Sequence, residues 1–151
     1  MNEISTSLVA ILNEQISCAQ EMLATLAREN QALLEGDADL LNTAGADKAR
    51  LVEALDSLEH ERRSLSDAIG LTFASAGDKS AGEESRPAQW RALLELIAEC
   101  KQQNQRNGAL VKARSEQVRI ALRALRGTEE SLYDPRGLEH AGRSARPLGT
   151  A

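Results

Sequence analysis

Aromatic residues are scarce in this chain of 151 residues, which contains one Phe, one Trp and one Tyr, together 2% of the sequence. Strands of β sandwiches and barrels are enriched in aromatic and β-branched residues, so these folds are disfavoured. Modules that stack nucleic-acid bases on aromatic side chains are disfavoured for the same reason. The core must therefore be built from Leu, Ile and Ala, which suits closely packed helices.

Long apolar runs are also lacking. A run such as Leu8–Leu12 has about a quarter of the ~20 residues needed to span a membrane. No Lys or Arg precedes the first apolar stretch, unlike in a secretory signal. We therefore expect a cytoplasmic protein with no membrane insertion. Cys18 and Cys100 are far apart, in no metal-ligand spacing, and are expected to stay reduced there.

Residue patterns typical of catalysis are missing as well. There is no glycine-rich phosphate loop, and His60-Glu61 is not followed by a second His at the spacing of a zinc motif. His60 lies among charged residues and is expected on a helix surface, while His140 falls near the C-terminus. We expect no enzyme, no cofactor and no metal site.

Apolar residues instead recur every three or four positions, which indicates amphipathic helices. We expect helices over about 3–35, 38–70 and 87–126. The first row is Val9, Leu12, Ile16, Ala19, Leu23, Leu26, Asn30 and Leu33. The second is Leu41, Ala44, Lys48, Leu51, Leu55, Leu58, Arg62, Leu65 and Ile69. The third is Trp90, Leu93, Ile97, Cys100, Asn104, Asn107, Val111, Arg114, Val118, Ala121 and Leu125.

Glycine and proline mark the breaks between these helices. Gly36 suits a helix C-terminus, and Asp37 can cap the next helix. Small and polar residues predict a mobile loop at 74–86. The third helix ends near Gly127 or continues for about one more turn to Leu132, before Asp134-Pro135. We expect a helical domain over 1–132 and a flexible, disordered tail over 133–151.

These elements predict an all-α fold, an elongated antiparallel three-helix bundle. The link between the first two helices has only a couple of residues, which forces a hairpin. The third helix can pack along both, with the left-handed crossing of about 20° that 3-4 spacing favours.

Polar residues interrupt the apolar rows: Asn30, Lys48, Arg62, Asn104, Asn107 and Arg114. One interpretation is that they set the register or reach the solvent at the bundle edge. The other is that the bundle is open at these residues and leaves a groove for a partner helix. Gly108 would let another backbone approach closely.

Surplus apolar residues point to a binding surface. Ile4, Leu8 and Ile11 form a second row, which ordinary three-helix packing can explain. Further apolar residues are concentrated in the second half of the third helix: Leu110, Ile120, Leu122 and Leu132. Uncovered apolar residues at helical spacing indicate a site for another amphipathic helix.

A basic row on the third helix consists of Lys112, Arg119, Arg123 and Arg126. Such a row can bind phosphate. The net charge of −5 and the lack of interleaved aromatic residues instead favour a face that is solvated or paired with acidic residues.

Several short segments together resemble the FlgN family of flagellar export chaperones. They include Glu29-Asn30-Gln31-Ala32-Leu33 before Gly36-Asp37, then Leu41, Lys48, Leu51, Leu55, Leu58 and Arg62. They continue with Trp90, the run from Asn104 through Asn107 and Gly108 to Val111, and Leu132-Tyr133-Asp134-Pro135-Arg136-Gly137. The last of these is similar to the family's Tyr-x-x-x-Gly signature.

The resemblance implies a non-enzymatic, cytoplasmic chaperone of type III flagellar export. It implies hook-associated (hook–filament junction) proteins as partners, held by their terminal amphipathic helices and delivered to the export gate. We expect the substrate-binding residues to be Leu110, Val111, Val118, Leu122 and Leu125. The resemblance suggests that Tyr133 binds the export gate; packing of Tyr133 onto the helix end is the alternative. A structural or regulatory coiled-coil protein that forms homo-oligomers through the same rows is the alternative function.

Overall fold

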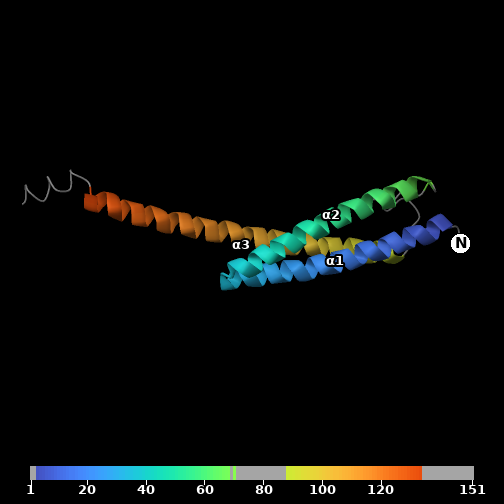
Figure 1. Ribbon diagram of the computed structural model, residues 1–151, viewed down its shortest axis with the longest axis horizontal. Helices are drawn as coiled ribbons and strands as arrows, with labels where there is room; N and C mark the ends of the chain where they lie inside the picture. The colour runs from blue at the N-terminus through green and yellow to red at the C-terminus, as the bar shows by residue number, and fades with distance from the viewer. Residues whose placement is uncertain (1–2, 69, 71–87, 134–151) are drawn as a thin grey trace, which may run out of the picture. The chain divides into compact units, whose positions relative to one another are not determined.

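Three helices make up the described part of the chain. The computed structural model describes residues 3–68, Gly70 and 88–133, with side chains as far as Thr128. The helices are α1 (Glu3–Glu35), α2 (Ala38–Ala68) and α3 (Ala88–Tyr133), shown in Figure 1. Since these ranges contain no strand, the predicted all-α class is confirmed. The predicted loop at 74–86 lies outside the described residues, as does the predicted tail over 133–151 apart from its first residue, Tyr133, which is the last residue of α3.

The turn between α1 and α2 follows from two residues. Gly36 adopts a φ of 71°, in the left-handed region that glycine enters without strain. The Asp37 amide donates to the Ala32 carbonyl at 3.0 Å, which closes the end of α1. The Asp37 carboxylate Oδ1 then accepts from the Leu40 amide at 3.0 Å and caps α2. Because the turn is this short, α1 and α2 form an antiparallel hairpin.

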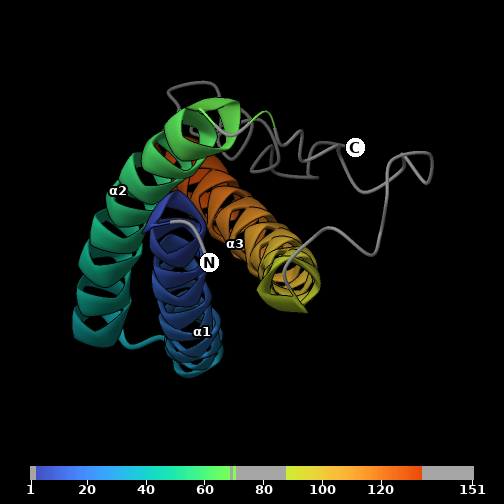
Figure 2. The same ribbon diagram turned by 90° about the vertical axis from the view of Figure 1, so that its right-hand side faces the viewer.

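The chain divides into two units, Met1–Leu110 and Val111–Ala151, and α3 contributes to both. In the first unit, Leu93 of α3 packs with Leu8 and Leu12, while Asn107 bonds to the Leu26 carbonyl. The first part of α3 therefore runs parallel to α1 and antiparallel to α2, which completes the predicted bundle (Figures 1 and 2).

Among the described residues, helix α1 supplies most of the buried side chains. Its buried row is Leu8, Leu12, Gln15, Ala19, Met22, Leu26, Glu29 and Leu33. Half of these residues belong to the expected row, and the other half lie one position earlier than expected. Two apolar clusters result: one joins Leu8, Leu12, Ala19 and Leu93, and the other joins Met22, Leu26 and Leu51.

Helix α3 is longer than the expected range of about 87–126. It continues through Gly127 and ends at Tyr133, close to the later of the two ends that the sequence left open. Gly127 is not among the glycines with positive φ, so the backbone stays helical there. A glycine inside a helix costs only about 1 kcal/mol relative to Ala, and one such residue does not stop a helix.

Candidate functional site

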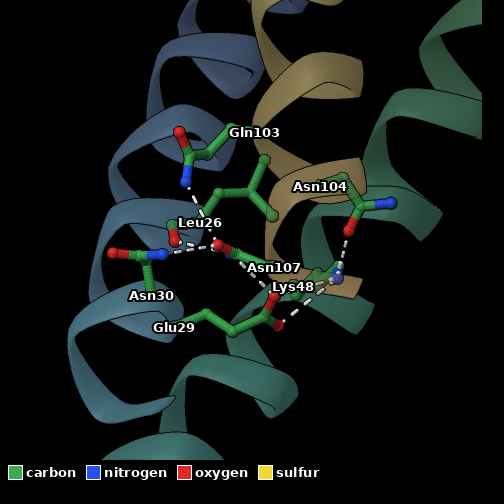
Figure 3. Close-up of polar contacts among 7 residues, drawn as sticks. All are labelled: Leu26, Glu29, Asn30, Lys48, Gln103, Asn104 and Asn107. Atoms are coloured by element: carbon green, nitrogen blue, oxygen red, sulfur yellow. Dashed lines mark hydrogen bonds and ion pairs between the residues drawn. The ribbon is translucent and has the colours of Figure 1, made fainter. Parts of the chain in front are cut away.

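A cluster of hydrogen bonds surrounds Asn107 in the first unit (Figure 3). Its Nδ2 donates to the Leu26 carbonyl at 2.8 Å and to Glu29 Oε1 at 3.0 Å. Its Oδ1 accepts from Asn30 Nδ2 and from Gln103 Nε2, both at 3.1 Å. An amide side chain has two donor and two acceptor positions, so the buried Asn107 uses all four.

Glu29 extends this Asn107 cluster to α2. The side chain of Glu29 is largely buried, and its two oxygens lie 3.3 and 3.4 Å from Lys48 Nζ. Lys48 also donates to Asn104 Oδ1 at 2.6 Å. The cluster thus connects all three helices, as Figure 3 shows: α2 contributes Lys48, and α1 and α3 contribute the other residues.

The Asn107 cluster decides between the two interpretations for four of the six polar residues in the rows. Asn30, Lys48, Asn104 and Asn107 bond to one another or to Glu29, which is what register-setting residues do. A buried polar group without a partner would cost about 1–3 kcal/mol, so any shift of α3 along the hairpin is penalised. At this level the bundle is closed, not open as a groove.

A second polar cluster lies nearer the start of α3. Arg62 is 5% exposed and donates to both oxygens of Glu59, at 2.8 and 2.9 Å. Its guanidinium lies 4.6 Å from the centroid of the Trp90 ring, a cation–π contact. Gln15 Nε2 donates to Glu59 Oε2 at 3.3 Å. Mainly through the Arg62 hydrogen bonds, the pKa of Glu59 is lowered from 4.5 to about 2.

The second unit presents a different surface. Every side chain from Val111 to Thr128 is exposed. The expected binding residues are 45% exposed at Val111, 59% at Val118, 50% at Leu122 and 64% at Leu125. At about 100° per residue, these four side chains fall within about 60° of one another around the helix axis. We call them the α3 apolar face.

The remaining predicted site residues are more scattered. Leu110 is half-buried at the end of the first unit, and Asn104 is exposed. Gly108 lies inside α3, with open space where a Cβ would be. Tyr133 is the last residue of α3, but its side chain is outside the described part, as is Gly137. The structure groups Val111, Val118, Leu122 and Leu125 on one face, and it places Asn104 and Asn107 in the Asn107 cluster.

Sequence reasoning missed the polar residues that α1 buries. Gln15, Thr25 and Glu29 are all less than a tenth exposed. Their positions continue the 3-4 spacing of Leu8, Leu12, Ala19 and Met22. That spacing is the sequence signal for their burial. A pattern of apolar residues alone does not include them, because all three are polar.

The His and Cys residues are the remaining candidates for metal ligands or reactive groups. Within the described ranges, no three His, Cys, Asp or Glu side chains lie close enough to hold a metal ion. His60 is exposed on α2, as expected, and His140 is outside the described residues. Cys18 and Cys100 are free and half-buried, and burial raises the pKa of both thiols.

Comparison with known proteins then decides the family. A family model described as FlgN protein matches residues 1–141. The chain belongs to the FlgN family. Membership supports a general role as a flagellar export chaperone, as the resemblance implied. No curated protein and no solved structure matched the chain. No helix in the described ranges has a stretch long and apolar enough to cross a membrane.

Proposed function

We propose that this FlgN-family chain acts in the cytoplasm and binds the terminal amphipathic helices of hook–filament junction proteins through the α3 apolar face. The observation that carries the proposal is the exposure of four aliphatic side chains on one side of a helix. Residues 111–125 extend for about 21 Å at 1.5 Å per residue. That length matches about four turns of a partner helix, whose own apolar side would be covered.

Covering a client helix has a clear physical benefit. An amphipathic helix exposed before assembly presents apolar surface that associates with other copies. Burying that surface against Val111, Val118, Leu122 and Leu125 keeps the subunit apart until it is exported. We also propose that Leu110, half-buried and one residue before the α3 apolar face, contacts the client helix. We further propose that Tyr133 contacts the export gate, since it ends α3 in a segment similar to the family signature.

A matched pair of substitutions tests the binding face. Val118 and Ile120 are 59% and 57% exposed in the same helix, but Ile120 lies on the opposite side from the face. Titration calorimetry with a synthetic terminal-helix peptide of a junction protein should show Val118→Asp binding at least about tenfold more weakly than the unmodified chain. Ile120→Asp should bind normally. Equal loss, or no loss, in both variants would contradict the assignment of this face.

Tyr133 requires a separate test, because its proposed partner is the gate. Tyr133→Ala should leave the peptide affinity unchanged and reduce secretion of junction proteins in cells. If both peptide binding and secretion are unchanged in this variant, Tyr133 has no role at the gate.

Self-association is the second candidate function, and the same face supports it. Steps of seven, four and three between Val111, Val118, Leu122 and Leu125 are those of a coiled-coil row. Sedimentation equilibrium of the free chain distinguishes the two functions. A stable oligomer that Val118→Asp dissociates, with no peptide binding, would favour the structural protein over the chaperone.

A further inference from the structure

The α3 apolar face has different neighbours on its two sides. Lys112, Arg119, Arg123 and Arg126 project within about 60° of one another, centred about 100° from the middle of the face. We call these four residues the basic flank. The other side of the face has a single base, Arg114. Its other residues are uncharged: Gln117, Ala121, Ala124 and Thr128.

Local charge differs in sign from the charge of the whole chain. Residues 111–128 contain five basic residues and one acidic residue, a net charge of +4, whereas the full chain carries −5. Arg119 pairs with Glu116 at 2.5 Å within α3. Among the described residues, Lys112, Arg123 and Arg126 have no acidic partner. Most of the basic flank is therefore available to pair with a ligand.

We infer that the partner of this face is an amphipathic helix with acidic side chains along one edge of its apolar side, and that the basic flank reads this edge. The inference rests on the proposed function and specifies the chemistry of the client. The α3 apolar face would cover the apolar row of the client helix. The basic flank beside it would then lie against the acidic row of the client. Because only one side of the face is strongly basic, the match also sets how the client helix is oriented.

A nucleic-acid ligand fits these residues less well. Phosphate binding would use the bases, but it would leave four aliphatic side chains uncovered beside them. Residues 111–128 contain no aromatic side chain on which a base could stack. The partner that covers both rows is a helix with both kinds of side chain.

The experiment is a double-variant cycle on the full chain. One change replaces Arg119, Arg123 and Arg126 with Gln; the other replaces the Asp and Glu residues of a junction-protein terminal-helix peptide with Asn and Gln. Each change alone should weaken binding about tenfold at low salt, since each exposed ion pair contributes modestly. Both together should weaken it little further, and the salt dependence should flatten. Replacing the exposed bases Arg91, Lys101 and Arg106 with Gln makes the same charge change elsewhere in α3 and should have little effect.

Results that differ from these expectations distinguish failure of the basic flank from failure of the proposed function. If Val118→Asp abolishes binding but neither neutralisation alters it, the proposed function stands and the basic flank is irrelevant. If the unmodified chain binds no peptide, the proposed function fails first. Heparin that binds as tightly as the peptide and competes with it would overturn the helical partner in favour of a polyanion. Dimers that dissociate when the three arginines are replaced would make a second copy the partner. Circular dichroism confirms that each variant is folded.

Discussion

The two units use the same kinds of side chain in opposite ways. In the first unit, Leu12 is fully buried and Asn107 has all four hydrogen-bond positions filled. In the second unit, Leu125 is 64% exposed. Residues that fold the bundle are therefore separate from residues that remain open to a partner. Substitutions in the two units should show this separation, since stability and binding should respond to different positions.

The largest difference is expected between two leucines. Leu12→Ala removes a side chain from the α1–α3 apolar cluster and should lower the free energy of unfolding by about 2–5 kcal/mol. Leu125→Ala should change it by less than about 0.5 kcal/mol, because its side chain is largely in solvent. Urea denaturation measures both. Similar losses in the two variants would mean that the second unit is also part of the cooperative core.

Two asparagines provide the next comparison. Asn107→Ala leaves the Leu26 carbonyl and the Asn30 and Gln103 amides short of a partner, so we expect a loss of about 2–3 kcal/mol. Asn104→Ala removes one exposed bond to Lys48 and should cost about 0.5 kcal/mol. Urea denaturation again gives both values. If Asn107→Ala is as mild as Asn104→Ala, the Asn107 cluster does not set the register of α3.

The third prediction concerns acid. The pKa of Glu59 is lowered from 4.5 to about 2 in the folded chain. The ionised carboxylate therefore adds its full contribution to the free energy of unfolding above pH 4.5, and this contribution is lost as the pH falls toward 2. Because the Glu59 side chain is about a third exposed, we expect only about 1 kcal/mol from it. The unfolding free energy of the unmodified chain and of Glu59→Gln should converge between pH 5 and pH 2. A constant difference across that range would contradict the pairing with Arg62.

Two glycines give the smallest expected effect. Gly45 and Gly108 lie inside helices, and apart from the local helix backbone no atom lies within 4 Å of the position of an added Cβ. Alanine at either position should stabilise the chain by about 0.5–1 kcal/mol, measured by urea denaturation. If Gly108→Ala also weakens peptide binding while Gly45→Ala does not, a partner backbone approaches α3 at Gly108.

The fold was predictable because helical periodicity and caps are local signals. Gly36 and Asp37 lie next to each other in the chain, and their backbone and side-chain bonds involve residues at most five positions away. The end of α3 was less predictable, since Gly127 can either end a helix or lie within one.

Long-range polar contacts could not be predicted in the same way. Asn107 and Glu29 are 78 positions apart, and nothing in either helix alone identifies the other as a partner. Asn107 stands out in the sequence as a polar residue in an apolar row, whereas Glu29 does not, and their pairing depends on the register of the helices. The α3 apolar face was predictable for the opposite reason, since Val111, Val118, Leu122 and Leu125 share one side of a single helix.

Hydrogen exchange with and without a junction-protein terminal-helix peptide tests most directly whether the second unit supplies the binding face. Bound peptide should slow exchange at the amides of residues 111–128. The amides of α1 and α2, already protected in the bundle, should change little. Protection gained in α1 and α2 but absent from residues 111–128 would contradict the account.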